Sequence, residues 1–273
     1  MDTKFFLGIG LAIVLVFSFA AVYTSFSRLP MAAVVVPEEH ETLYQVSTID
    51  ALMLGVYDGV QQISELKKHG DFGIGTFDAL EGEMIVLDGK IYQAKADGRV
   101  YLVRDNATTP LAMVTHFNQD FSATTGEFMN FSSFPKGMST RLPSQNMIYA
   151  VRVHGSFPQM KVRAIPMQQK PYPPLTEAAK NQSIYTYANA TGTIVGFYTP
   201  DFFKGLNVPG YHLHFMSDDH QTGGHILDFV VPANTTVEYD ITPKFEMLLP
   251  TSGAFTGVNL SQDLSKELVR VES

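Results

Sequence analysis

The stretch Gly210–Phe229, "GYHLHFMSDDHQTGGHILDF", predicts two β-strands joined by a turn. Successive side chains of a strand point to opposite faces, so His212 and His214 share one face, while the apolar residues beside them can enter a core on the other. The intervening "SDDHQTGG" is rich in turn-forming residues. His225 opens the second strand, and pairing of the two strands as a hairpin would bring it beside the first two histidines.

Three imidazoles around one point are the ligand set of a catalytic zinc site with an open fourth position. We therefore predict a metal site on this hairpin, held by His212, His214 and His225. Zn²⁺ is the first choice because all three ligands are imidazoles and no carboxylate completes a facial triad, although these ligands also suit iron, nickel or manganese. The alternative interpretation makes His212 and His214 ordinary half-buried polar residues on a sheet face.

The turn of this hairpin holds further polar groups. His220 is expected to face solvent or to lie behind the metal ligands. Carboxylates often orient ligand imidazoles, and Asp218, Asp219 and Asp228 are close enough in sequence to do so. The spacing does not select among the three.

Strand signals continue on both sides of the histidine hairpin. The Asp-Gly pairs at 88–89 and 97–98 lie between β-branched or aromatic runs, which is the strongest short signal for a hairpin. Further strands are predicted at residues 147–165, as a pair, and at residues 191–202, 235–241 and 244–250. The chain is therefore expected to adopt an α+β fold with mostly antiparallel sheets.

Helices are predicted in three segments. In residues 47–70, apolar side chains recur at the spacing of one buried helix face, with Ser47 and Asp50 as a capping pair. A proline-rich turn leads into a short helix within residues 169–182, and residues 261–273 form a short capped helix and tail.

The composition excludes several kinds of site. None of the 273 residues is a cysteine, which rules out disulfides, thiolate metal ligands and a cysteine nucleophile. The formal net charge is −8, and the lysines and arginines form no cluster, so nucleic acid is not expected as a partner. An anionic substrate would need a local cation against this background.

The N-terminal segment differs in kind from the rest. Residues 5–23 carry no charge, and as a helix they would be about 28 Å long, near the thickness of a bilayer core. The segment is either a secretory signal peptide, with a small-x-small cleavage site at residues 18–20, or an uncleaved membrane anchor. We expect residues 1–36 to be this segment plus a linker, and residues 37–273 to be the folded domain. The domain is expected to be exported, and either secreted or anchored to the outer face of the cytoplasmic membrane.

Four stretches together resemble the α-acetolactate decarboxylase family: the histidine hairpin, "GDFGIGTFDALEGEMIVLDGKIYQ" (70–93), "QKPYPPLTEAAKNQ" (169–182) and "GTIVGFYTPDF" (192–202). The similarity runs from about residue 44 to the end of the chain. It implies decarboxylation of 2-acetolactate to (R)-acetoin and carbon dioxide, a step of acetoin biosynthesis, with zinc held by the three histidines. It also implies two β-sheet subdomains with inserted helices, and a homodimer.

The resemblance points to further site residues outside the hairpin. It makes Arg163 a substrate-facing cation, Glu83 a carboxylate near the metal and Thr76 a hydrogen-bonding group for the substrate. Glu272 matches a glutamate of the family's C-terminal tail, with Glu267 as a nearby competitor for that assignment. The role of Glu272 requires the tail to fold back over the metal.

The chemistry of the implied reaction explains this set of groups. Loss of carbon dioxide from acetolactate leaves an electron pair that the adjacent ketone accepts, giving an enediolate for which a metal acts as electron sink. Arg163 can receive the substrate carboxylate in a bidentate contact. Glu83 or Glu272 can deliver the proton to one face of the intermediate. No binding motif for pyridoxal phosphate or thiamine is evident.

Two other functions remain open from the sequence. One is a cupin-like metal oxygenase, in which an H-x-H pair is usually followed by a glutamate three or four residues later. Asp218 and Asp219, four and five residues after His214, lie nearest those positions here, and the third histidine comes earlier than in cupins. The other is an exported metal-binding protein without catalytic activity.

Overall fold

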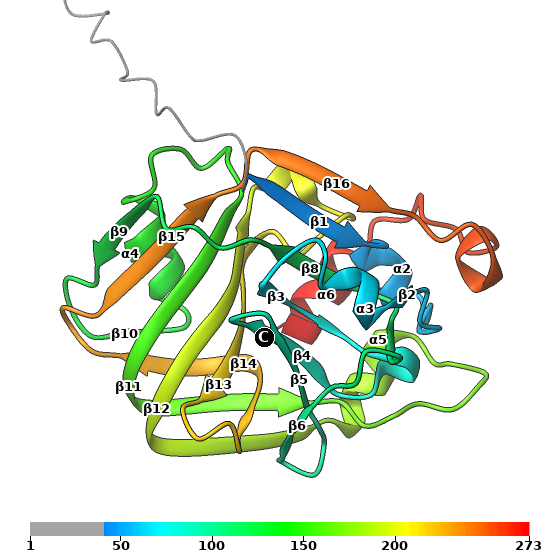
Figure 1. The fold of residues 1–273 in the computed structure, drawn as a ribbon, viewed down its shortest axis with the longest axis horizontal. Helices are drawn as coiled ribbons and strands as arrows, with labels where there is room; N and C mark the ends of the chain where they lie inside the picture. Colours follow the sequence, from blue (N-terminus) through cyan, green and yellow to red (C-terminus); the bar gives the residue numbers. More distant parts are fainter. Residues whose placement is uncertain (1–40, 273) are drawn as a thin grey trace, which may run out of the picture. The chain divides into compact units, whose positions relative to one another are not determined.

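The computed structural model describes residues 41–272, in which two seven-stranded β-sheets dominate the regular structure (Figure 1). The predicted export segment and the predicted domain boundary near residue 36 lie outside the described residues. Within residues 41–272, no helix combines the length and the apolar character needed to cross a bilayer.

The first sheet is mixed. Its strands, in spatial order, are β16 (Lys244–Leu248), β1 (Thr42–Val46), β8 (Ala112–Thr115), β3 (Phe72–Thr76), β4 (Glu83–Leu87), β5 (Lys90–Ala94) and β6 (Val100–Leu102). Strands β1 and β16 run parallel, and the other neighbours are antiparallel.

The second sheet is antiparallel. Its order is β10 (Met129–Asn130), β14 (Gly223–Val231), β13 (Gly210–Ser217), β12 (Ser183–Thr199), β11 (Tyr149–Ala164), β15 (Thr236–Ile241) and β9 (Phe121–Thr124). A separate two-stranded sheet joins β2 (Gln61–Gln62) to β7 (Thr108–Thr109).

The helices are short, and all but η4 and α6 lie between strands. They are α2 (Ile49–Met53), α3 (Ile63–Leu66), α4 (Phe134–Ser139), α5 (Leu175–Ala178) and α6 (Ser265–Glu272), with 3₁₀ turns η1 (Asp78–Leu80), η2 (Ala179–Asn181), η3 (Asp201–Phe203) and η4 (Gly253–Thr256). The expected α+β architecture, with two mixed or antiparallel sheets and inserted helices, is confirmed.

Strand β11 changes partner along its length, and this closes four strands on themselves. Residues 149–152 of β11 pair with β15, whereas residues 159–163 pair with β14. Since β11, β12, β13 and β14 also pair in sequence, the four form a closed ring of strands. Apolar side chains from all four strands pack in one core cluster, among them Met160, Ile194, Phe215 and Ile226.

The opposite face of these strands packs against the first sheet. A second core cluster joins Ile74 and Ile85 of the first sheet to Val195, Phe197 and Met216 of the second. His212 and His214 alternate with the residues of the closed ring's core, so they point toward this layer between the sheets. The fold therefore places the predicted metal ligands in the interior.

The prediction of a single helix over residues 47–70 is wrong. Helix α2 ends at Met53, and Gly55 adopts a φ of +85° where an added Cβ would lie 3.0 Å from the carbonyl oxygen of Pro173. The chain then enters β2 and α3. The cap also differs: the hydroxyl of Thr48, not Ser47, accepts the Ala51 N–H. Packing against a distant loop overrides the local periodicity here.

Two strand predictions also need correction. Residues 147–165 form one strand instead of a pair, because β12 pairs with β11 from Tyr149 to Ala164 without an intervening turn. The segment 244–250 does not continue the sheet of β15. Its strand β16 crosses to the first sheet and runs parallel to β1.

The predicted strand at residues 191–202 is present only to Thr199, as the end of β12, and Asp201–Phe203 form η3 instead. The predicted hairpin turns and short helices are confirmed. Asp88 and Gly89, with φ of 51° and 72°, make the two-residue turn between β4 and β5. The pair at 97–98 lies in the turn between β5 and β6, and the short helices near residues 175 and 265 are present.

Candidate active site

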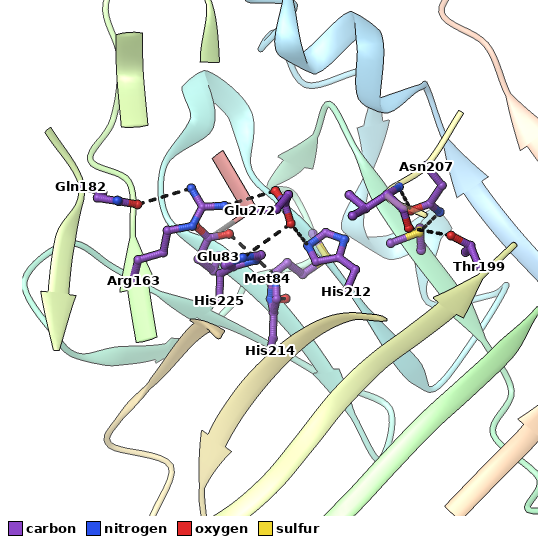
Figure 2. Close-up of polar contacts among 12 residues, drawn as sticks. Glu83, Met84, Arg163, Gln182, Thr199, Asn207, His212, His214, His225 and Glu272 are labelled. Atoms are coloured by element: carbon purple, nitrogen blue, oxygen red, sulfur yellow. Dashed lines mark hydrogen bonds and ion pairs between the residues drawn. The ribbon is translucent and has the colours of Figure 1, made fainter. Parts of the chain in front are cut away.

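The three predicted ligands converge. His214 of β13 is the register partner of His225 of β14, and His212 lies two residues before His214 on the same face. The ring centroids are 5.4, 5.1 and 5.3 Å apart, and candidate ligand atoms of all three lie within 4.8 Å of one another. Figure 2 shows the rings facing a common point.

The environment keeps these imidazoles neutral. Burial, reinforced by the charge of Arg163, lowers the pKa of His212 to about 3. Burial likewise lowers the pKa of His214 and of His225 well below the ordinary histidine value, and Arg163 and neighbouring rings add to the effect. Neutral imidazoles have a free nitrogen lone pair, which is the form that binds a metal.

The nitrogens are also arranged for coordination. Nδ1 of His214 lies 2.8 Å from the carbonyl oxygen of Met84, so this nitrogen donates and Nε2 keeps its lone pair. The Nε2 atom of His225 is buried and makes no hydrogen bond with another described residue. A buried nitrogen without a hydrogen-bond partner is costly unless it binds something else, so the donor set fits a divalent metal.

Arg163 lies beside the histidines because of the closed strand ring. It is the register partner of His225 across β11 and β14, and its side chain is buried. One guanidinium nitrogen, Nη2, is 3.4 Å from Oε1 of Glu272, and Nη1 is 3.5 Å from Oε1 of Gln182. The Nε atom has no hydrogen-bond partner among the described residues. The guanidinium therefore has donor capacity left for an anionic group.

Glu83 reaches the site from the other sheet. It begins β4, and its Oε2 lies 3.9 Å from Nε2 of His214. Burial raises the pKa of Glu83 to about 7, and Arg163 opposes the rise more than Glu272 adds to it. The backbone N–H of Ile165 also favours the charged form. Glu83 is thus a carboxyl group that can hold or release a proton near neutral pH.

The C-terminal helix brings Glu272 over the histidines. Its Oε2 is 3.6 Å from Nε2 of His212 and 3.5 Å from Nε2 of His225, while Oε1 faces Arg163 (Figure 2). Burial raises the pKa of Glu272, and the charge of Arg163 opposes the rise. The tail therefore folds back as its predicted role requires, and Glu272, not Glu267, is the residue that reaches the site.

Thr76 is close to the site but its hydroxyl is already engaged. It ends β3 opposite Glu83, and its Oγ1 donates to the carbonyl oxygen of Gly82 at 2.7 Å. This bond holds the turn that leads into β4. The Thr76 hydroxyl therefore helps to position Glu83, the residue that follows Gly82, in this structure.

All seven predicted residues line one small cavity of about 40 Å³. Apolar side chains complete its wall, among them Leu52, Leu80, Leu111 and Leu175. Glu272 and His225 also line a larger groove of about 710 Å³, which Leu268 and Val269 of α6 line as well. Glu272 and His225 are therefore shared by the histidine cavity and the groove.

The other polar residues of the hairpin lie elsewhere. Asp218 contacts His154 at 3.2 Å, Asp219 accepts from Ser217, and Oδ1 of Asp228 accepts the backbone N–H of Phe131. None of these contacts orients a ligand imidazole. The expectation that one of these aspartates does so is therefore wrong, and the carboxylate positions of a cupin are not assembled either.

Two groups at the site have no signal in the sequence pattern. The Met84 carbonyl orients His214, and a backbone oxygen cannot be read from side-chain types. Gln182 faces Arg163 from the end of η2, although the two are far apart in sequence. His220, left open above, lies in the exposed turn with its Nδ1 3.3 Å from the Tyr92 hydroxyl.

The fold and the site together define a class of protein: a two-sheet α+β domain with a buried three-histidine centre, one buried arginine and two carboxyl groups with raised pKa. The model of the α-acetolactate decarboxylase family matches residues 43–262. The chain belongs to this family. The match ends before Glu272, so the placement of that residue rests on the geometry given above.

Individual members of the family are similar to this chain over most of its length. The chain is 50% identical over 232 residues to an α-acetolactate decarboxylase of Methanosarcina mazei, covering 85% of this chain and 80% of that protein. It is 39% identical over 231 residues to the Bacillus subtilis enzyme, covering 84% of this chain and 90% of the relative. The crystal structure of the Bacillus subtilis strain 168 protein superposes with a TM-score of 0.81 at 38% identity, covering 85% of this chain and 98% of that one.

Proposed function

We propose that this chain decarboxylates 2-acetolactate to (R)-acetoin and carbon dioxide, and is thus a carboxy-lyase. Family membership supports the reaction. The observation that carries the proposal is the juxtaposition of buried Arg163 with three neutral imidazoles and two carboxyl groups around one cavity. This set offers a cation for the substrate carboxylate, ligands for a metal and a proton donor.

His212, His214 and His225 would hold the metal, with Zn²⁺ as the expected ion. When bound, the ion supplies a Lewis acid that stabilises negative charge developing on substrate oxygen. The chain contributes the neutral state of the three rings and the fixed orientation of His214 through Met84. The chain also buries the three ligand rings.

Arg163 binds the carboxylate that leaves as carbon dioxide. A guanidinium recognises a carboxylate through two parallel hydrogen bonds, which fixes its orientation as well as its position. Glu272 now faces Nη2 of Arg163 at 3.4 Å, so the substrate carboxylate and Glu272 compete for this group. We expect Glu272 to turn toward the reacting carbon when substrate binds.

Glu83 and Glu272 are the proton donors available to the product. Both are buried, and burial raises the pKa of each, so each holds a proton at higher pH than an exposed carboxyl group. Glu83 approaches from β4, 3.9 Å from Nε2 of His214, and Glu272 approaches from α6, 3.5 Å from Nε2 of His225. Protonation from one fixed side yields one enantiomer of acetoin.

The decisive experiment measures acetoin from racemic acetolactate with and without a chelator, using chiral gas chromatography. We expect (R)-acetoin, loss of activity on chelation and recovery with Zn²⁺. Metal analysis is expected to show about one divalent ion per chain, lost in His212→Ala and His214→Ala. Oxygen uptake would indicate an oxygenase instead, and bound metal without acetoin would indicate a non-catalytic metal-binding protein.

We further propose that the enzyme works as a homodimer outside the cytoplasm. The family resemblance supports the dimer, and the uncharged residues 5–23 support export. Sedimentation equilibrium is expected to give twice the 30.2 kDa mass of the chain, less any cleaved segment. Cell fractionation that recovers the intact N-terminus only in the cytosol would exclude export.

A further inference from the structure

Asparagines in this chain are followed by hydroxyl residues far more often than composition explains. Nine asparagines occur, and serine plus threonine make up 39 of the 273 residues, so about one asparagine would carry a hydroxyl residue two positions later. Six do so, each with a residue other than proline between: Asn106, Asn130, Asn181, Asn189, Asn234 and Asn259. This N-x-S/T pattern is the acceptor sequence for N-linked glycans.

All six of these asparagines are exposed. Local structure explains two of them without any modification. The side-chain oxygen of Asn130 accepts from Ser132 Oγ at 2.9 Å, and that of Asn259 accepts from Ser261 Oγ at 2.5 Å. In both places the serine of the pattern stabilises a turn. These two therefore carry little weight. The pattern at Asn181 also ends in serine, and its middle residue, Gln182, contacts Arg163 of the site, so it is left out as well.

The three patterns that end in threonine are different. The side-chain amides of Asn106, Asn189 and Asn234 make no hydrogen bond with another described residue. Asn189 and Asn234 adopt φ of 52° and 62°, a backbone conformation that favours asparagine. That preference explains the asparagine and not the threonine two residues later. The Thr191 hydroxyl lies 2.9 Å from the Ser156 hydroxyl, whereas the hydroxyls of Thr108 and Thr236 make no hydrogen bond with another described residue.

The location of these three side chains leaves the catalytic cavity free. Asn106 lies in the turn between β6 and β7, Asn189 within β12 opposite Pro158, and Asn234 in the turn between β14 and β15. None of the three lines the histidine cavity or the groove beside α6, whereas Asn130 lines that groove. A bulky group at these positions would not obstruct the substrate.

We propose that the exported domain is N-glycosylated at Asn106, Asn189 and Asn234. The co-reactant is a lipid-linked oligosaccharide phosphate or pyrophosphate. The amide Nδ2 of asparagine attacks the anomeric carbon, the new C–N bond replaces the C–O bond to the phosphate, Nδ2 loses a proton, and the lipid phosphate leaves. The proposal rests on export of the domain and not on its catalytic activity.

The test is mass spectrometry of the full-length protein purified from the cells that naturally produce it. Proteolytic peptides that contain Asn106, Asn189 or Asn234 are expected to carry a glycan mass. Thr108→Ala, Thr191→Ala and Thr236→Ala should each remove the glycan at one site, whereas the Thr→Ser changes should retain it. The exposed residues Asn118 and Asn146 lie outside the pattern and serve as internal controls.

Unmodified peptides at all three asparagines would overturn the proposal, and so would equal modification at Asn118 or Asn146. A triple variant, Asn106→Gln with Asn189→Gln and Asn234→Gln, is expected to keep its turnover with acetolactate. Failure of the glycan proposal is therefore distinguishable from failure of the proposed function, which the acetoin assay tests separately.

Discussion

At the scale of single residues, burial is what gives the site its chemistry. An exposed histidine is half protonated near neutral pH, and an exposed glutamate is ionised there. In this cavity burial lowers the pKa of the three histidines and raises the pKa of Glu83 to about 7, because the charged forms lose their hydration. Arg163 keeps its charge and is the one buried cation among the residues that line the cavity.

Removal of the guanidinium tests the carboxylate-binding role. Arg163→Ala is expected to lower turnover by at least about 10²-fold while metal content stays near wild type. Arg163→Lys keeps the charge but loses the bidentate geometry, so we expect an intermediate loss and a raised KM. Steady-state kinetics and metal analysis provide the readouts. Full activity of the alanine variant would show that another group binds the carboxylate.

The two neighbouring glutamates at the start of β4 form a matched pair. Glu83→Gln removes a carboxyl group 3.9 Å from His214 and is expected to lower turnover by at least about 10²-fold. Glu81→Gln is the control, because Glu81 pairs with Lys95 at 2.8 Å on the partly exposed side of the turn and is expected to leave turnover unchanged. An equal loss of turnover in the two variants would mean that the structure of the turn, and not the carboxyl group of Glu83, is required for activity.

At the scale of elements, the approach of β14 to β11 decides where His225 lies. Gly224 has a φ of +146°, and an added Cβ would lie 2.5 Å from the carbonyl oxygen of Arg163. A side chain here would push apart the two strands that carry Arg163 and His225.

We therefore expect Gly224→Ala to lower Tm by at least about 4 °C and to reduce bound metal. Gly89→Ala is the comparison, since Gly89 also has a positive φ of +72° but its nearest neighbour, Asp71 Cβ, is 4.0 Å away. That variant should lose about 1 kcal/mol from backbone strain and keep its metal. Thermal denaturation and metal analysis of both variants make the comparison.

Helix α6 delivers Glu272 and depends on packing for its stability. Eight residues are too few for a stable helix in isolation, so its docking rests on Leu268 and Val271, which are buried in a cluster with residues of α2 and α5. Leu268→Ala is expected to weaken this docking by about 2–5 kcal/mol.

The loosened helix should expose the site. We expect at least about a tenfold loss of turnover in Leu268→Ala and faster amide exchange confined to residues 265–272. Val269→Ala is the control, because Val269 is 67% exposed and should change neither quantity. Unchanged turnover despite rapid exchange of α6 would argue against a role for Glu272.

At the scale of the whole molecule, the junction of the two sheets carries a buried acid. Asp240 of β15 is only 3% exposed, and its carboxyl group accepts the backbone N–H of Asn118. Burial raises the pKa of Asp240 to about 8, and the charges of Asp120, Asp71 and Glu41 add to the rise. Asp240 does not line the histidine cavity and has no part in the proposed chemistry.

This acid makes stability depend on pH. Its proton is held more tightly in the folded chain than in the unfolded chain, whose aspartate titrates near 3.9. Stability from this group is therefore complete below about pH 4, falls as pH rises, and levels off above about pH 8. Asp240→Asn should match wild type near pH 4 and gain at least about 3 °C in Tm at pH 9. A gain that is equal at both pH values would exclude the titration as its cause.

The sequence by itself determined the histidine hairpin and the tight turn between β4 and β5. The period-two alternation of His212 and His214, and the turn before His225, depend only on neighbours along the chain, and they are enough to predict a three-histidine cluster. The hairpin at Asp88-Gly89 is determined in the same way. Family resemblance added Arg163, Glu83, Glu272 and Thr76 as residues of the same site, without their geometry.

Only the tertiary structure decided how those distant residues meet. Closure of β11 on β14 sets Arg163 beside His225, and packing of the two sheets sets Glu83 and the Met84 carbonyl beside His214. The same packing ended the predicted helix at Gly55 and joined residues 147–165 into one strand. Register between distant strands depends on the total burial of both faces. A short window of sequence contains only one of the two strands that pair. Local patterns therefore cannot specify the register between distant strands.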